Sequence, residues 1–166
     1  MKHFHFYFRL IPIYALVFLL TILTALVGNR AVQTIAETAQ IARNYTIIID
    51  AGHGGEDGGA VSCTGVTESS INLEIALRLN DLMHFLGFNT KMIRTEDVSI
   101  YTEGDTIAQK KVSDLKDRVR ICNETEGAIL LSIHQNTFSD NRYSGAQVFY
   151  NGEGLDLAQH LQDALR

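Results

Sequence analysis

The sequence predicts an α/β domain with a mostly parallel sheet flanked by helices, preceded by an N-terminal transmembrane or signal-anchor helix. Short apolar runs rich in β-branched residues alternate with segments whose apolar residues recur at helical spacing. This alternation is typical of parallel sheets with helical crossovers. The runs are apolar throughout, as in strands that are covered on both faces. Near the N-terminus, residues 10–27 form a stretch of 18 positions without a charged side chain.

The uncharged stretch of residues 10–27 predicts a membrane segment. As a helix it measures about 27 Å, close to the thickness of a bilayer core. Lys2 and Arg9 precede it, which favours a cytoplasmic location for residues 1–9 and translocation of the rest. A cleaved signal peptide is the alternative, although residues 25–28 make a poor cleavage site. The domain is thus expected on the extracytoplasmic side of the cell membrane, or secreted.

We interpret residues 28–44 as an alanine-rich linker and residues 45–166 as the domain. Residues 45–50 predict a buried strand that runs into a glycine-rich turn. Thr67 is expected to cap a helix that Gly87 ends. Ser113 is expected to cap a second helix. The remaining elements follow in order: strand 88–93, surface loop 96–111, strand 128–133, strand 146–150 and helix 155–165.

Composition excludes some classes of function. The net charge is −5, and a nucleic-acid surface usually needs a basic face, so no nucleic-acid partner is expected. The two cysteines are too few for a disulfide framework. Cys122 falls in a helical pattern and is interpreted as a small buried residue. Cys63 is interpreted as an incidental loop residue, with a zinc ligand or a regulatory thiol as the alternatives.

Three distant residues are expected to converge at one edge of the sheet. They are either the ligands of one metal ion or, alternatively, two hydrogen-bonded histidines and a solvated acid in the first turn of a helix. His53 and His134 each follow a predicted strand, and Glu68 opens the helix after the first strand. The carboxyl ends of parallel strands and the helix starts that follow them share one edge of a sheet. Two imidazoles and one carboxylate, with a fourth position left for water, are a ligand set of hydrolytic zinc. Glycines 52, 54 and 55 suit a tight turn close to such an ion.

Several motifs then resemble a known family, the zinc-dependent N-acetylmuramoyl-L-alanine amidases of the type 3 class. Residues 48–60 read IIDAGHGGEDGGA, residues 67–73 read TESSINL, and residues 131–136 read LSIHQN. Arg94-Thr95, the Arg-x-x-x-x-Asn pattern of residues 118–123 and the segment 145–150 resemble further family motifs. The insertion around Tyr101 and the short N-terminal anchor look most like the spore-cortex, germination-specific amidases.

The resemblance implies a reaction and a cofactor. A single Zn²⁺ held by His53, Glu68 and His134 would activate water to hydrolyse the amide between N-acetylmuramic acid and L-alanine in peptidoglycan. In the spore-cortex enzymes this reaction leads to muramic-lactam formation. Asn136 and Arg94 are candidates for binding or positioning substrate.

The sequence departs from the family pattern at its C-terminal side. The family's general-base glutamate lies beyond the position of Arg166, and the domain is interpreted as lacking its C-terminal part. Asp50, Glu56 and Asp57 lie near the proposed metal, but none is assigned as the general base. Two alternatives stay open: a non-catalytic domain that binds zinc and peptidoglycan, and another zinc hydrolase of the wall, such as a carboxypeptidase or a deacetylase.

Overall fold

The computed structural model describes residues 2–137, 140, 142 and 144–166. Within these residues the chain forms two compact units, Met1–His134 and Gln135–Arg166. The first unit contains the sheet and every predicted metal ligand, and the second contains the last helix.

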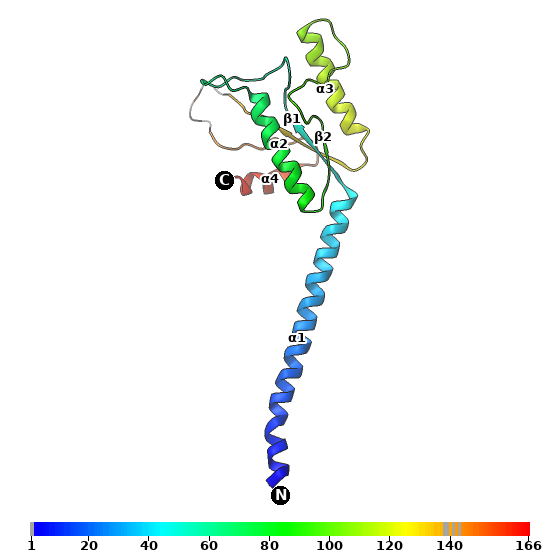
Figure 1. Cartoon of the computed structure of the whole chain (residues 1–166), viewed down its shortest axis with the longest axis vertical. Helices are drawn as coiled ribbons and strands as arrows, with labels where there is room; N and C mark the ends of the chain where they lie inside the picture. Colours follow the sequence, from blue (N-terminus) through cyan, green and yellow to red (C-terminus); the bar gives the residue numbers. More distant parts are fainter. Residues whose placement is uncertain (1, 138–139, 141, 143) are drawn as a thin grey trace. The chain divides into compact units, whose positions relative to one another are not determined.

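The N-terminal segment is one helix, α1 (Lys2–Asn44), which includes the residues 28–44 interpreted above as a linker (Figure 1). Its stretch Pro12–Glu37 has a mean hydropathy of 1.9 and no buried residue. By length and composition this stretch is able to cross a membrane, a test that a signal sequence also passes.

Three parallel strands form the sheet, as the alternating pattern predicted. Strand β1 (Thr46–Ala51) lies between β2 (Asn89–Met92) and β3 (Ala128–Ile133). In the register, Ile49 faces both Met92 and Leu131. The predicted α/β fold with a parallel sheet is thereby confirmed.

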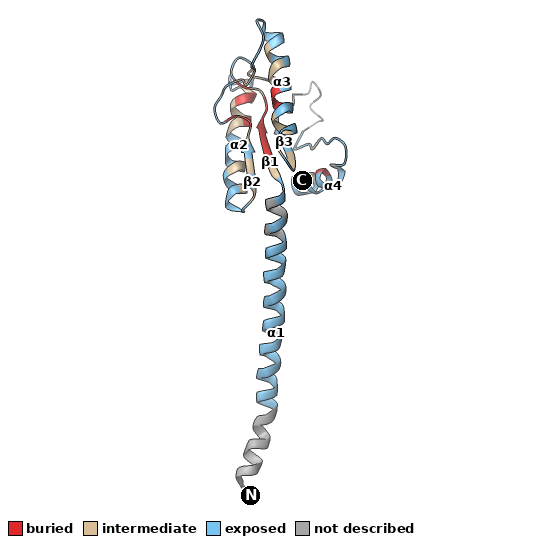
Figure 2. Cartoon of the chain, turned by 90° about the vertical axis from the view of Figure 1, so that its right-hand side faces the viewer, coloured by how far each residue is buried: buried red, intermediate tan, exposed pale blue. Residues whose placement is uncertain are grey.

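Helices lie on the two sides of the central strand (Figure 2). Ile47, Ile49 and Ala51 of β1 form a core cluster with Ala76 of α2 (Glu68–Phe85). Side chains alternate along a strand, so Asp50 points to the other face. There it meets α3 (Ile107–Asn123).

The second predicted helix begins earlier than expected. It was expected to start at Ser113, but α3 starts at Ile107 with Thr106 as its N-cap. The Thr106 hydroxyl accepts from the backbone of Gln109, whose side chain accepts in turn from the backbone of Thr106. This capping box satisfies two helix-end donors. Ser113 instead accepts the backbone N–H groups of Thr102 and Glu103.

The predicted strand at residues 146–150 was wrong. These residues, which are all described, have no strand geometry. Their backbone finds another partner: the side-chain amide of Gln162, in α4 (Leu155–Ala164), accepts from Val148 N and donates to Ala146 O. A strand needs a neighbouring strand for its backbone groups, and here one side chain takes that role.

Candidate metal centre

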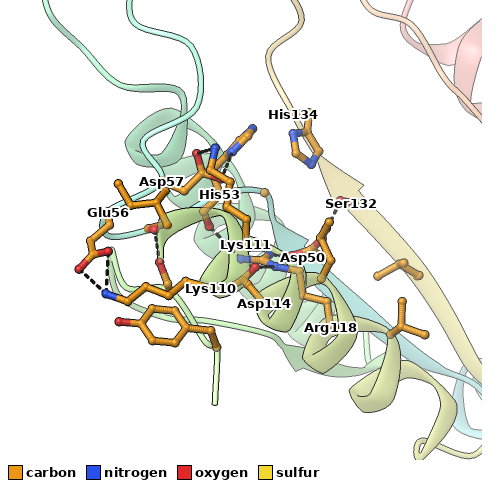
Figure 3. A pocket seen from close by; sticks show the side chains of 18 residues that line it. Asp50, His53, Glu56, Asp57, Lys110, Lys111, Asp114, Arg118, Ser132 and His134 are labelled. Atoms are coloured by element: carbon orange, nitrogen blue, oxygen red, sulfur yellow. Dashed lines mark hydrogen bonds and ion pairs between the residues drawn. The ribbon is translucent and has the colours of Figure 1, made fainter. Parts of the chain in front are cut away.

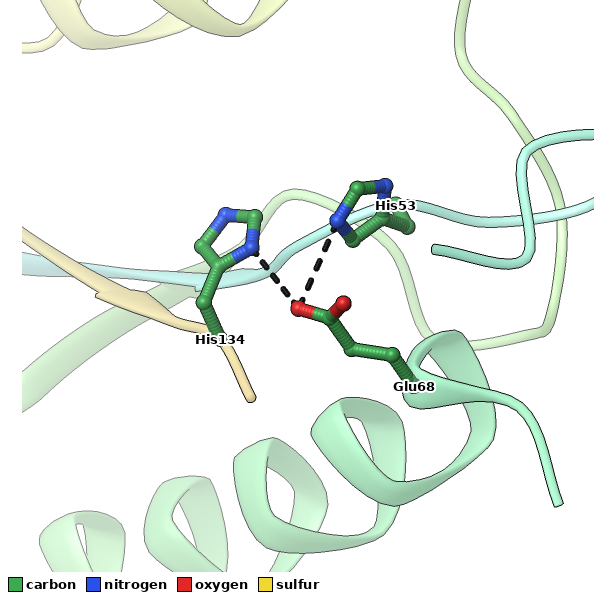
Figure 4. Close-up of side chains that lie close together, drawn as sticks. All are labelled: His53, Glu68 and His134. Atoms are coloured by element: carbon green, nitrogen blue, oxygen red, sulfur yellow. Dashed lines mark hydrogen bonds and ion pairs between the residues drawn. The ribbon is translucent and has the colours of Figure 1, made fainter. Parts of the chain in front are cut away.

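The structure brings His53, Glu68 and His134 together at the carboxyl edge of the sheet (Figure 4). One ligand atom from each residue lies within 4.8 Å of the other two. Glu68 Oε1 is 3.4 Å from His53 Nε2 and 3.0 Å from His134 Nδ1. The two imidazole rings meet edge to face, with centroids 4.9 Å apart.

The carboxylate of Glu68 is buried and held on several sides. The residue is 6% exposed. Its Oε2 accepts from the backbone N–H of Ala60 at 3.0 Å. Its Oε1 accepts from Asn72 Nδ2 at 3.4 Å, and the same amide donates to Gly52 O at 3.2 Å. Asn72 thus joins the glutamate to the loop that carries His53.

A second carboxylate orients His53. Asp57 Oδ2 lies 3.1 Å from His53 Nδ1, which leaves Nε2 directed at the cluster. Carboxylates in this position fix the tautomer of a ligating histidine and raise its basicity. Burial raises the pKa of Asp57, but hydrogen bonds from Lys111 and His53 outweigh it and hold the pKa below its ordinary value. From the sequence, Asp57 was expected near the metal and was not assigned as the general base.

The backbone at the metal loop is unusual. His53 has a φ of 62°, in the left-handed region, which costs a residue with a β-carbon about 1–2 kcal/mol. Gly54 and Gly55 also have positive φ, as a tight turn requires. Gly52 serves a different purpose, because an added Cβ there would lie 2.3 Å from Cε1 and Nε2 of His134.

Of the two predicted substrate-binding residues, Arg94 lies in the interior. It is 3% exposed, and its guanidinium donates to the carbonyls of Ala51, Gly52 and Ser69. Burial lowers its pKa. Asn136 is exposed and belongs to the second unit. The structure therefore brings the three metal candidates together. Arg94 is buried next to them, against the backbone of the loop and the helix that carry His53 and Glu68.

Sequence reasoning gave no individual role to Arg118, which is also buried beside the metal loop. It forms an ion pair with Asp50 and donates to Asp114 Oδ2 at 2.5 Å and to His53 O at 2.9 Å. Although burial lowers its pKa, Asp114 and Asp50 raise it above the ordinary value. Its signal in the sequence was its place at the start of the Arg-x-x-x-x-Asn pattern of residues 118–123.

A cavity of about 450 Å³ opens beside the two histidines (Figure 3). One part of its wall is charged and includes Asp57 and Lys111, and another is apolar and includes Leu115 and Leu130. This volume lies in the range of small-molecule sites. His53 and His134 thus face a space that can hold a substrate group.

Comparison with known proteins shows the family to which the chain belongs. Residues 47–166 match the N-acetylmuramoyl-L-alanine amidase family. The chain belongs to this family. Over 124 residues it is 38% identical to the germination-specific N-acetylmuramoyl-L-alanine amidase of Bacillus subtilis, a match that covers 72% of this chain and 52% of that relative. The chain thus spans about half the length of this amidase.

Two solved amidases have similar structures. The CwlD amidase of Clostridioides difficile, solved in complex with the GerS lipoprotein, has a TM-score of 0.68 and 38% identity, and the match covers 74% of this chain and 65% of that one. An N-acetylmuramoyl-L-alanine amidase of Clostridium difficile has a TM-score of 0.55 and 31% identity, covering 72% and 61%.

Proposed function

We propose that this chain is a zinc-dependent N-acetylmuramoyl-L-alanine amidase that cuts the amide between N-acetylmuramic acid and L-alanine in peptidoglycan. One observation carries the proposal: two imidazoles and one carboxylate from three distant segments converge within 4.8 Å. Family membership supports the reaction type.

The donor set fits zinc in chemistry, and the two contacts of its carboxylate fit zinc in spacing. Ligand atoms about 2.0–2.1 Å from a tetrahedral zinc lie about 3.3 Å from one another. The contacts of Glu68 Oε1 with the two histidines, at 3.4 and 3.0 Å, agree with this separation. His53, Glu68 and His134 would hold the ion, whose chemistry is to lower the pKa of water and to polarise a carbonyl oxygen.

The protein groups around the ion would orient it and the substrate. Asp57 holds the His53 ring, and Asn72 with Ala60 N holds the Glu68 carboxylate. The side chain of His134 is 44% exposed. A substrate amide would therefore reach the metal from the side on which His134 lies. Groups that flank this amide would enter the adjoining cavity. Asn136, just after this ligand, stays a candidate for substrate contact.

The acids near the cluster do not serve as general base in this proposal. Asp50 pairs with Arg118, Glu56 pairs with Lys110, and Asp57 is bound to Lys111 and to His53. A carboxylate whose oxygens are already bound by a cation is poorly placed to take a proton from water, because proton transfer needs a free oxygen within hydrogen-bond reach. This observation favours a second candidate function for the chain, a domain that binds zinc and peptidoglycan without cleaving it.

We place the domain on the extracytoplasmic side of the membrane, where peptidoglycan lies. The apolar stretch Pro12–Glu37 supports an anchor or a signal segment. The names of similar proteins, a germination-specific amidase and an amidase solved with a lipoprotein, support a role in the spore cortex. Because one similar amidase was solved with a lipoprotein, a lipoprotein tethered to the membrane is the kind of binding partner to test for this chain. Spores that lack this gene should then contain less muramic lactam in the cortex.

Digestion of purified peptidoglycan tests the reaction. The full chain should contain about one zinc ion per molecule and release peptides with a free N-terminal L-alanine, as mass spectrometry detects. His134→Ala should lose both properties. Release of D-alanine or acetate instead would identify a carboxypeptidase or a deacetylase. Retention on peptidoglycan without cleavage, unchanged in His134→Ala, would favour the non-catalytic candidate.

A further inference from the structure

Three consecutive backbone carbonyls at the end of β1 accept hydrogen bonds from buried arginines. Ala51 O accepts from Arg94 Nε at 2.8 Å and from Arg118 Nη1 at 3.1 Å. Gly52 O accepts from Arg94 Nη2 at 3.2 Å, and His53 O accepts from Arg118 Nη2 at 2.9 Å. The loop that carries the first metal candidate is thus held by two guanidinium groups.

Arg94 joins this loop to the helix that carries Glu68. Its Nη2 also donates to Ser69 O at 2.8 Å, one residue after the glutamate. Its Nη1 donates to Glu96 O at 2.9 Å. One planar group therefore ties the end of β1 to the first turn of α2 and to the segment after β2.

Arg118 joins the same loop to the strand that leads to His134. It pairs with Asp50, whose Oδ2 accepts from Ser132 Oγ at 2.7 Å. Ser132 lies two residues before His134 in β3. The link from α3 to β3 therefore passes through the side chain of Asp50.

The two arginines approach from different sides of the sheet. Arg94 bonds to α2, which packs against the face that bears Ile49. Arg118 belongs to α3 and meets Asp50, whose side chain points to the other face. Buried charges are retained only with several good hydrogen bonds, and a lysine lacks the planar fork that makes several at once.

We propose that Arg94 and Arg118 are positioning residues that hold His53, Glu68 and His134 at metal-binding distance by clamping the carbonyls of residues 51–53. This inference rests on the proposed zinc site. The left-handed backbone of His53 adds to the argument, because Arg118 binds the carbonyl of that same residue. Without this bond the His53 backbone would be free to relax and to move its ring.

Zinc affinity of the full-length chain, measured by competition with a chromophoric chelator, tests the inference. Arg94→Lys and Arg118→Lys should each weaken zinc binding about 10–100-fold, the usual effect of losing an outer-sphere partner of a metal ligand. Arg120→Lys is the matched control. It lies two residues further along α3, with a side chain that is 53% exposed, and should bind zinc like the wild type.

Thermal unfolding separates positioning from general stabilisation. A residue that only stabilises the fold lowers the melting temperatures of the zinc-free and zinc-loaded chains equally. A positioning residue also shrinks the rise that a fixed zinc concentration produces. Ser132→Ala is a milder change in the link between Arg118 and β3, and it should also shrink the rise in melting temperature that zinc produces. If Arg118→Lys does not fold, the result for Ser132→Ala tests the proposed role of Arg118.

The outcomes distinguish the two proposals. If the wild type binds no zinc, the proposed function fails. If the wild type binds zinc and both lysine variants bind it equally tightly, the clamp is wrong while the zinc site stands. Unchanged affinity in Ser132→Ala and in the arginine variant that folds would refute the clamp in the same way.

Discussion

Replacing Gly52 by alanine should remove His134 from the metal centre while leaving the fold intact. The new Cβ would lie 2.3 Å from Cε1 and Nε2 of the imidazole and 2.7 Å from Nδ1. To reach 3.4 Å, where ordinary contact begins, the ring must retreat by about 1.1 Å. Zinc–ligand distances tolerate only about ±0.2 Å, so the ring can no longer serve as a ligand.

The magnitude follows from this displacement. Loss of a direct ligand should weaken zinc binding by at least the effect of losing an outer-sphere partner, about 100-fold or 2.7 kcal/mol. The zinc-free protein should keep its melting temperature, because the His134 side chain is already 44% exposed and is able to turn into solvent. Gly52 has no positive φ, so alanine brings no backbone strain there.

Chelator competition on Gly52→Ala and Gly58→Ala measures the effect. Gly58 is the matched control, since a Cβ there would meet only the side chain of Thr67, at 3.2 Å. We expect Gly58→Ala to bind zinc within a few-fold of the wild type. Wild-type affinity in Gly52→Ala would refute the reasoning, because it would mean that His134 is not a ligand or that its ring lies elsewhere.

Three further predictions concern the surroundings of the site and the N-terminal helix. Asp57→Ala should weaken zinc binding about 10-fold, measured by chelator competition, because the His53 ring loses its orienting acceptor. Asp117 has a lowered pKa, with the hydrogen bond from Arg120 as the main cause. The Asp117 carboxylate therefore contributes its full stabilisation above the unfolded pKa of about 3.9, and this contribution is lost as pH falls through the lower folded pKa. In urea titrations below pH 4, the free energy of unfolding of Asp117→Asn should therefore fall less with pH than that of the wild type. Leu20→Arg should impair membrane insertion by about 2.5–3.5 kcal/mol, measured by fractionation.

Controls for these changes lie nearby. Glu56→Ala alters the residue next to Asp57 but removes only an ion pair with Lys110, and zinc affinity should stay the same. A wild-type acid profile in Asp117→Asn would contradict the assigned pKa direction. Equal membrane fractions for Leu20→Arg and the wild type would count against an apolar membrane segment.

Parallel topology alone predicted that the three residues share one edge of the sheet, and the resemblance to family motifs predicted that they hold a metal. Each of His53, Glu68 and His134 lies at a strand end or a helix start, and these positions are set by apolar periodicity. The role of Gly52 was not predictable in this way. Its missing side chain matters because of a ring 82 positions further along the chain, and spacing contains no information about such a contact.

Other features were missed in the sequence because they depend on particular side-chain contacts. The start of α3 was missed although Thr106 and Gln109 form a capping-box pattern, because polar residues obscured the helical periodicity. The segment 146–150 has the composition of a strand, but strand formation depends on a partner, and Gln162 binds its backbone instead. Arg94 became a candidate for positioning substrate through its resemblance to a family motif, and its sequence position gave no sign of the carbonyls of Ala51, Gly52 and Ser69 to which it donates.

The pairing of β1 with β3 has a consequence for when the metal is acquired. Glu68 and His134 are 66 positions apart, and Asp50 and Ser132 are 82 apart. Such distant contacts form late in folding, after the entropy of closing a long loop has been overcome. On the proposed route the chain crosses the membrane unfolded, so no cytoplasmic state of it would carry the assembled ligand set. Zinc would then bind only after residues 45–166 have folded outside the cytoplasm. The zinc would have to come from the cell envelope and not from the cytoplasm.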